Sequence, residues 1–156
     1  MYDIGDKIVY PMYGAGVIQA IEEREVFGEK ALYYVLSVPS AIRVMIPVAN
    51  AEKINIRDVI SAAEADHVLE EFANYGRDEN ENWNKRCRDN MTRIRGGDVY
   101  EVAFVVKSLM LRDRERMLST GERKMLTNAK KILLSELTLA KNETMEAMEK
   151  LLEGAV

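Results

Sequence analysis

The chain has 156 residues, 47% of them hydrophobic and 31% charged, which is typical of a folded globular protein and excludes wholesale disorder. Its single cysteine, Cys87, and single histidine, His67, exclude an intrachain disulfide framework and a Cys/His zinc cluster. No apolar stretch approaches the roughly 20 residues that span a bilayer, and the acidic N-terminus lacks the basic region of a signal peptide. We therefore expect a cytoplasmic protein.

The first part of the chain has the pattern of short strands separated by turns. Glycine and proline residues interrupt the apolar segments, and Gly28 stands where a hairpin would turn. The expected strands are residues 8–10, 17–21, 24–27, 31–38 and 42–46, with a turn at Pro39-Ser40. Short strands at this spacing predict a small antiparallel β-barrel over residues 1–54.

From residue 57 onward, apolar residues recur at helical spacing. Ser61, Asp98, Ser119 and Asn142 have the short polar side chains that begin helices, and a glutamate follows each serine three residues later. The expected helices are residues 61–76, 83–94, 98–116, 119–139 and 142–152, with residues 77–82 as a loop. The sequence therefore predicts an α+β protein of two domains, a barrel followed by a compact all-α domain of about five helices over residues 57–156.

The net charge of −4 is unevenly distributed along the chain. Residues 83–131 carry a net charge of +7, whereas residues 57–82 carry −6 and residues 132–156 carry −3. A basic segment of this kind can attract phosphate locally. A helical surface on which the charges average out is an equally good interpretation of the charges alone.

The sequence contains no recognisable arrangement for catalysis. The Gly14-Ala15-Gly16 turn lacks the further glycine and the Lys-Ser/Thr pair of a phosphate-binding loop. His67 has no cysteine near it in the sequence as a co-ligand, and Cys87 is expected to be a packing residue. We therefore expect neither an enzyme nor a site for a metal, a cofactor or a small-molecule substrate.

Trp83, the only tryptophan, stands between two asparagines at the start of an expected helix, with little apolar company on its helical face. Lys85, Arg86 and Arg88 follow it. An exposed indole next to cations suits a nucleic-acid contact, because the cations hold the phosphate backbone while the ring stacks on an unstacked base or wedges against it. An indole that fills the junction between the domains is the alternative, since large aromatic side chains are mostly buried.

A second group of cations surrounds the expected break between the third and fourth helices. Arg112 and Arg116 share a helical face at the end of one helix, and Arg123 and Lys124 begin the next. The helix dipole explains cations at a C-terminus but not at an N-terminus. We therefore add Arg112, Arg123 and Lys124 to the candidate DNA contacts.

The last expected strand alternates in character. Arg43 and Met45 lie on one face, and Val44 and Ile46 lie on the other. At the edge of a sheet, this strand would be able to extend the sheet of a partner protein, with Arg24 as an added charged contact. A closed barrel in which the two arginines are merely solvated is the alternative.

Four segments resemble the CarD/CdnL family of bacterial transcription regulators, in the same order over almost the whole chain. They are residues 5–16 (GDKIVYPMYGAG), 57–60 (RDVI), 82–86 (NWNKR) and 112–122 (RDRERMLSTGE). The first segment is shared with the RNA-polymerase-binding domain of the transcription-repair coupling factor. The tryptophan segment and the helical half are specific to CarD.

The resemblance implies a Tudor-like barrel that binds the β subunit of RNA polymerase, partly by extending a sheet. It also implies a helical domain that touches promoter DNA at the upstream edge of the melted region. Trp83 matches the family tryptophan that wedges into the minor groove there and slows closure of the bubble. The basic residues that hold the DNA backbone are matched by Lys85, Arg86 and Arg88.

Arg123 matches another basic position of the family's DNA-facing surface, and Arg24 matches a basic position that contacts polymerase. Where some relatives carry an arginine, this chain has Met45, and its own arginine is Arg43 on the same face of the strand. We therefore expect a non-enzymatic regulator that stabilises the open promoter complex and contacts DNA weakly, without strong sequence preference. A protein–protein adaptor whose helical domain never touches DNA is the alternative.

Overall fold

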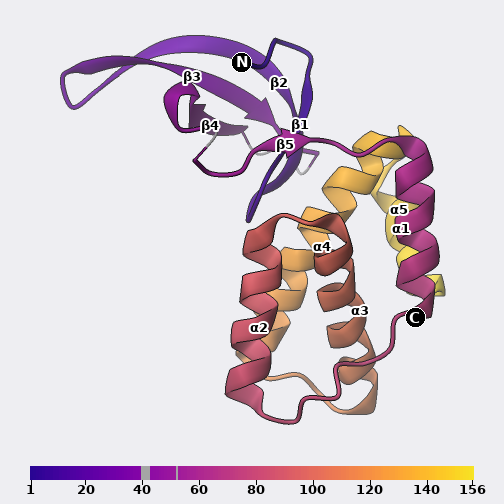
Figure 1. Cartoon of the computed structure of the whole chain (residues 1–156). Coiled ribbons are helices and arrows are strands. Elements are labelled where there is room, and N and C mark those ends of the chain that lie inside the picture. Colours follow the sequence, from indigo (N-terminus) through magenta and orange to yellow (C-terminus); the bar gives the residue numbers. More distant parts are fainter. Residues whose placement is uncertain (40–42, 52) are drawn as a thin grey trace.

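A computed structural model describes residues 1–39, 43–51 and 53–156 of the chain, with a β-sheet at one end and a bundle of helices at the other (Figure 1). Ser40 and Ile42, which belong to a predicted turn and a predicted strand, lie outside these residues. The strands are β1 (Lys7–Tyr10), β2 (Gly14–Val26), β3 (Glu29–Ser37), β4 (Arg43–Pro47) and β5 (Arg57–Asp58), with a 3-10 turn, η1 (Val48–Asn50), after β4. The helices are α1 (Ala62–Asn74), α2 (Trp83–Gly96), α3 (Val99–Glu115), α4 (Thr120–Lys141) and α5 (Met145–Gly154).

The five strands form an antiparallel sheet in the order β4-β3-β2-β1-β5. The predicted antiparallel module is confirmed, but its closure into a barrel is not, because the outermost strands β4 and β5 do not pair with each other among the described residues. The sequence also failed to predict β5, which pairs with β1 through Val9 and Arg57. A strand of two residues is too short to show an alternating pattern.

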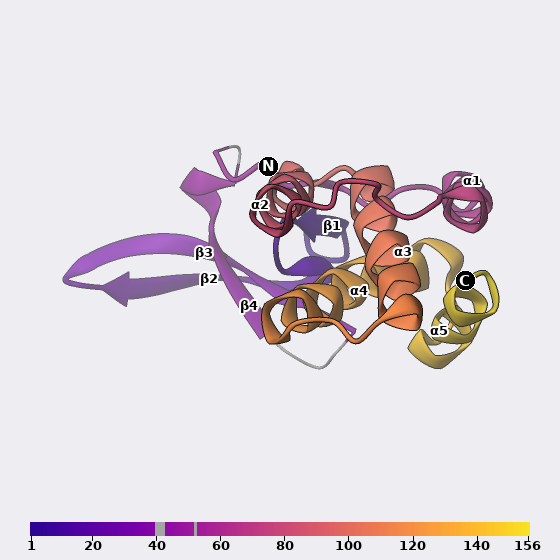
Figure 2. The same cartoon turned by 90° about the horizontal axis from the view of Figure 1, so that it is seen from below.

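The longest strands, β2 and β3, form a ribbon that projects from the body of the molecule (Figure 2). The two strands predicted over residues 17–21 and 24–27 are one continuous strand, with a register shift between Ile18 and Ala20. The predicted hairpin turn is confirmed: Phe27 and Gly28, with φ angles of 52° and 80°, link the paired residues Val26 and Glu29. Two left-handed residues are what a tight hairpin turn requires.

Short polar side chains begin the helices, as predicted. Ser61, Asp98 and Ser119 each accept a hydrogen bond from a backbone N–H group in the first turn. The prediction for Asn142 is wrong: it ends α4 in the left-handed conformation (φ 54°), and Thr144 begins α5. Asparagine serves at either end of a helix because it also tolerates the left-handed conformation.

The apolar residues form two cores. One lies in the helical half, where α3 packs against α1, α2 and α4 (Figure 2). The other lies under the sheet and includes Ile8, Ile18, Tyr34 and Ile46. In the described part of the chain, no helix has the length and apolar character needed to cross a membrane.

Candidate nucleic-acid interface

Trp83 is the first residue of α2 and lies at the end of the helical half that is remote from the sheet (Figure 1). The end of α3 and the start of α4 lie at the same end of the bundle. The Trp83 side chain is 48% exposed, although it is among the largest in the chain. It therefore does not fill the junction between the sheet and the helices, which was the alternative interpretation of the sequence.

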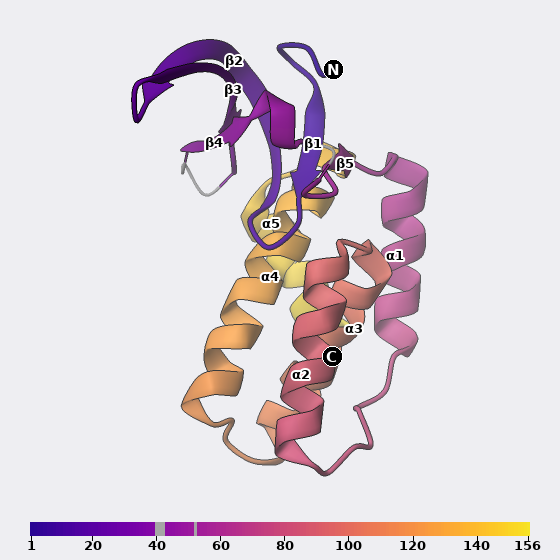
Figure 3. The same cartoon turned by 60° about the vertical axis from the view of Figure 1, so that its left-hand side comes forward.

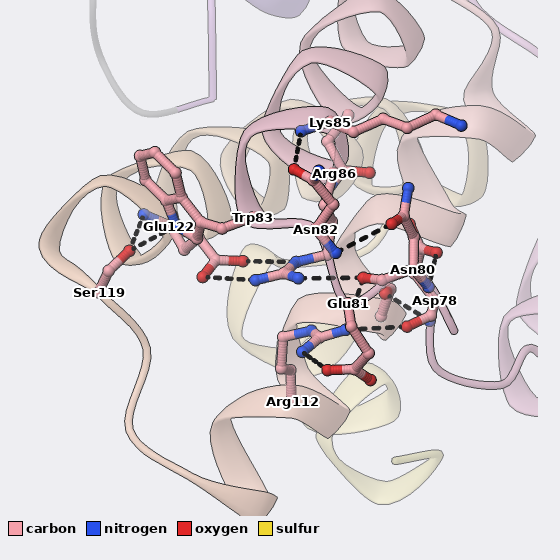
Figure 4. Close-up of polar contacts among 12 residues, drawn as sticks. Asp78, Asn80, Glu81, Asn82, Trp83, Lys85, Arg86, Arg112, Ser119 and Glu122 are labelled. Atoms are coloured by element: carbon pink, nitrogen blue, oxygen red, sulfur yellow. Dashed lines mark hydrogen bonds and ion pairs between the residues drawn. The ribbon is translucent and has the colours of Figure 1, made fainter.

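One side of the indole rests on the start of α4. The indole Nε1–H group donates a long hydrogen bond of 3.4 Å to the Ser119 hydroxyl (Figure 4). Gly121 lies next to the ring, and a Cβ atom added there would be 4.0 Å from the Cζ2 atom of Trp83. A helix N-terminus without a large side chain thus supports the ring, while about half of the ring surface stays open to a partner.

Behind the indole, a buried ion pair joins α2 to α4. The guanidinium of Arg86 donates to the carboxylate of Glu122 through two hydrogen bonds of 3.1 and 3.2 Å, and both residues are about 5% exposed or less. This guanidinium is enclosed in the protein and already paired, so we do not include Arg86 among the proposed phosphate contacts. Its role is to join the helix of Trp83 to the helix on which the indole rests.

The same pair changes the interpretation of the capping motif at residues 119–122. As predicted, the Glu122 N–H group donates to the Ser119 hydroxyl (3.2 Å). The Glu122 carboxylate, which in a capping box would return to the N-cap backbone, binds Arg86 instead. The motif therefore predicted the start of the helix correctly, but the carboxylate binds a different partner from the one that a capping box implies.

Arg112 is also enclosed, with 5% exposure. Its Nη2 atom donates to the carbonyl oxygens of Asp78 (2.9 Å) and Asn80 (3.4 Å), and its Nη1 atom lies 4.0 Å from the Glu81 carboxylate. We leave Arg112 out of the proposed phosphate contacts for the same reason as Arg86. Arg112 fixes the loop before Trp83 rather than a phosphate.

That loop, residues 77–82, is ordered by alternating polar side chains. The Asp78 carboxylate accepts from the Asn80 N–H group and the Asn80 side chain from the Asn82 N–H group, both at 3.0 Å. The Asn82 side chain accepts from the Lys85 N–H group (3.1 Å) and so begins α2. Arg86 donates to the Asn80 carbonyl (3.0 Å). Asx side chains at every second position, residues 78, 80 and 82, are typical of an ordered turn, so the sequence contained a signal for the structure of this loop.

The exposed cations near Trp83 in the sequence or in space lie on two helices, α2 and α4. Lys85 and Arg88 are exposed, but helix geometry places them on the opposite side of α2 from Trp83, and Figure 4 shows the Lys85 side chain extending away from the ring. Lys124 is exposed one helical turn after the glycine that supports the ring. Arg123 is half exposed and lies 3.3 Å from the Asp113 carboxylate.

A hollow of about 280 Å³ opens beside the indole. Trp83, Met117 and Leu118 supply its apolar lining, and exposed Arg116 stands at the same hollow. Arg116 was not among the predicted DNA contacts, although it is the exposed arginine among the three that line this hollow. The hollow is also lined by Glu81, Arg86, Arg112 and Glu122.

The local environment of Cys87 makes it an ordinary packing residue. Burial raises the pKa of its thiol, and the nearby Glu122 carboxylate raises it further, while Arg86 acts in the opposite direction. A raised pKa keeps the sulfur protonated and unreactive.

The second candidate surface is the free edge of the sheet. β4 is an outermost strand, with Arg43 and Met45 exposed, Val44 partly buried and Ile46 buried. The predicted alternation of this strand is therefore confirmed. On β2, the exposed Arg24 guanidinium lies 2.7 Å from the carboxylate of Glu22 on the same strand.

Comparisons with known proteins match both halves of the chain. The model of the CarD C-terminal domain matches residues 67–153, and the model of the CarD-like/TRCF RID domain matches residues 2–60. A Bacillus subtilis (strain 168) protein, YdeB, which is named as a transcription factor, is 41% identical over 145 residues. That match covers 92% of this chain and 95% of YdeB.

Proposed function

The chain belongs to the CarD family of bacterial transcription factors, which is not a family of enzymes, and from this premise we propose how it acts. Its sheet binds the β subunit of RNA polymerase, and its helical half stabilises the open promoter complex through Trp83 at the upstream edge of the bubble. The protein is therefore cytoplasmic and associates with the nucleoid through RNA polymerase.

The observation that carries the DNA contact is the half-exposed indole at the free end of the bundle. Stacking of a base on an aromatic ring contributes about 1–3 kcal/mol and tolerates any base. The neighbouring Arg116 and Lys124 are placed to hold the phosphate backbone. Such a contact is weak on its own and largely independent of sequence.

The observation that supports polymerase binding is the outer edge of β4, which pairs with no further strand among the described residues. An exposed edge offers backbone N–H and C=O groups to a strand of a partner, and Arg43 and Met45 project beside them. Docking there raises the effective concentration of the helical half at the promoter, which compensates for its weak affinity for DNA.

The direct test is the substitution Trp83→Ala, followed by measurement of the open-complex lifetime with a competitor that traps dissociated polymerase. We expect a loss of about 1–3 kcal/mol of stabilisation. The factor by which the protein prolongs the open-complex lifetime should therefore fall roughly 5- to 150-fold, while polymerase binding stays unchanged. Trp83→Phe should retain part of the effect. Leu151→Ala removes an equally exposed apolar side chain from α5 and serves as the control. An unchanged lifetime for Trp83→Ala would exclude the wedge.

The polymerase contact has its own test. Arg24→Glu and Arg43→Glu should weaken binding to the isolated β subunit without changing the circular dichroism of the protein. Lys30→Glu, at an exposed position on the same ribbon, is the matched control. Equal recovery of all three variants in a pull-down would remove both arginines from the site.

One observation favours the adaptor function instead. Met117, next to the indole, is 83% exposed, so the site also offers apolar surface to a protein. Forked DNA distinguishes the two functions, because phosphate contacts weaken steeply with salt whereas apolar contacts do not. A helical half that fails to bind forked DNA at low salt, with or without polymerase, would favour the adaptor.

A further inference from the structure

The seam between the sheet and the helices contains a partly buried, doubly hydrogen-bonded ion pair, in which Glu136 is enclosed and the Arg57 side chain is 30% exposed. Arg57 lies on β5, the edge strand next to β1. Its guanidinium donates to both carboxylate oxygens of Glu136 on α4, at 2.6 and 2.7 Å. Its Nε–H group also donates to the carbonyl of Gly97 (2.9 Å), and the Glu136 carboxylate accepts from the N–H group of Ile60 (3.1 Å). Glu136 is only 3% exposed. One arginine thus joins the sheet to two separate parts of the bundle.

A second contact holds the turn between β1 and β2 against α4 (Figure 3). The Ser135 hydroxyl accepts from the Ala15 N–H group (2.8 Å) and donates to the Ile132 carbonyl (2.6 Å). Gly14 has a φ of +113°, and a Cβ atom there would lie 2.7 Å from the Ser135 oxygen. The turn therefore approaches the helix as closely as a backbone without side chain allows.

The seam is closely packed around Gly97, whereas a hollow of about 230 Å³ opens beside Ser135, between the β1–β2 turn and α4. Pro11, in the turn, lies against Gly97, where an added Cβ atom would be 3.0 Å from the proline ring. The void lined by Pro11, Gly97 and Glu136 has a volume of about 10 Å³, no larger than the roughly 10–15 Å³ that a single water molecule needs. Closely packed interfaces of this kind resist small displacements.

We infer that Arg57, Ser135 and Glu136 are positioning residues that fix the place of Trp83 relative to the polymerase-binding edge of the sheet. This inference rests on the proposed function. α2 is the lever: Trp83 begins it, and the Gly97 carbonyl just beyond its other end is held by Arg57. The seam sets the direction in which this lever points.

The length of the lever shows why a fixed seam matters. A helix of 14 residues is about 21 Å long at 1.5 Å per residue. A tilt of about 10° at the seam would move the indole by roughly 4 Å over that length. The rise between stacked bases is about 3.4 Å. A loose seam would therefore move the wedge by a whole base step relative to the docked polymerase.

The inference predicts a separation of effects that a merely stabilising seam would not produce. The variant Ser135→Ala/Glu136→Leu removes both polar clamps and keeps most of the buried volume. Its affinity for the β subunit and its affinity for forked DNA should each stay within about twofold of wild type, because neither surface is touched. Its extension of the open-complex lifetime should fall about tenfold, because the two contacts no longer reinforce each other.

Amide hydrogen exchange verifies that the seam has loosened, since the Ala15 and Ile60 N–H groups lose their acceptors in this variant. Glu149→Leu is the matched control: it removes an ion pair with Lys130 between α4 and α5, within the helical half, and should leave all three measurements unchanged. A loosened variant with a wild-type open-complex lifetime would overturn the inference. So would loss of affinity for either partner alone, which would show that the seam builds a binding surface.

A reversible cross-link completes the test. The Cβ position at residue 97 lies 3.6 Å from the Pro11 Cβ atom, within the range of about 3.5–4.5 Å for disulfides. Pro11→Cys/Gly97→Cys, added to the loosened variant in a Cys87→Ser background, should restore the lifetime when oxidised and lose it when reduced; the reduced form is the reference, because a cysteine at the left-handed residue 97 (φ +78°) is strained in both states. Equal lifetimes in the two states would contradict the inference. A wild-type protein that does not extend the lifetime at all would refute the proposed function, and this inference with it.

Discussion

The buried pair behind the indole permits a quantitative prediction. The Arg86→Met substitution keeps an unbranched side chain of similar length and leaves the Glu122 carboxylate enclosed without its cation. The side chains of the pair are 6% and 5% exposed, so solvent does little to compensate. Removing one partner of a pair buried to this degree costs about 3–5 kcal/mol. With a urea m-value of about 2 kcal/mol/M, the midpoint of unfolding should fall by about 2 M.

A double-mutant cycle measured by urea unfolding separates the pair from its surroundings. Arg86→Met/Glu122→Leu fills the space with apolar groups and should lose less stability than either single substitution, as expected for a buried ion pair. Arg123→Met is the matched control, because it breaks the exposed pair with Asp113 and should cost about 1 kcal/mol or less. Intrinsic fluorescence reports the consequence for the site, since Trp83 is the only tryptophan.

The same substitution should also change the exposure of the indole. Arg86 holds the Asn80 carbonyl in the loop before Trp83, so Arg86→Met should increase the accessibility of the ring to a quencher even where the protein is fully folded. A loss of less than about 1 kcal/mol would refute the magnitude, because it would mean that water screens the pair. Unchanged quenching would refute the positioning role.

Three further predictions concern other parts of the molecule. Gly14→Ala should destabilise the protein by about 3 kcal/mol in urea unfolding, because the new methyl group meets Ser135 and the residue must keep a left-handed φ; a neutral result would mean that the seam can open. Burial lowers the pKa of Lys107 below 10.5, so the native state releases this proton before the unfolded state does. Wild type should therefore gain stability relative to Lys107→Met as the pH rises toward 10.5, as measured by urea unfolding; a parallel pH dependence would contradict this. Lys124→Gln should weaken binding to forked DNA and reduce the slope of log K against log salt by about 1, whereas Lys131→Gln, two turns further along α4, should leave both unchanged.

Local signals in the sequence predicted most of the secondary structure. Ser61, Asp98 and Ser119 begin helices because an oxygen on a short side chain can reach only the N–H groups of its own first turn. The same locality explains the hairpin at Phe27-Gly28. Asn142 shows the limit, since its side chain and backbone suit both a helix start and a helix end. Only the competing hydroxyl of Thr144 decides between them.

The partners of the charged side chains were not predictable in the same way. Arg86 stands among exposed cations in the sequence, and nothing local marks it as the one that turns inward. Its partner, Glu122, is 36 residues away and meets it only after α2 and α4 have packed. The pairing of Arg57 with Glu136 spans 79 residues. Sequence patterns therefore singled out the indole that the structure leaves half exposed and misjudged which cations face outward.

That misjudgement has a physical consequence for the mode of action. Arg86 and Arg112 are enclosed, and Arg123 has a carboxylate beside it, so few cations near the indole are available to phosphates. If Arg116 and Lys124 contact two phosphates, log K should fall with log salt with a slope of only about −2, against about −10 for a repressor that relies on charge. Affinity this small does not hold a protein at a promoter. Under the proposed function, the docked sheet and the seam supply the rest, so a variant that loses polymerase binding should lose the promoter as well, even with every DNA contact intact.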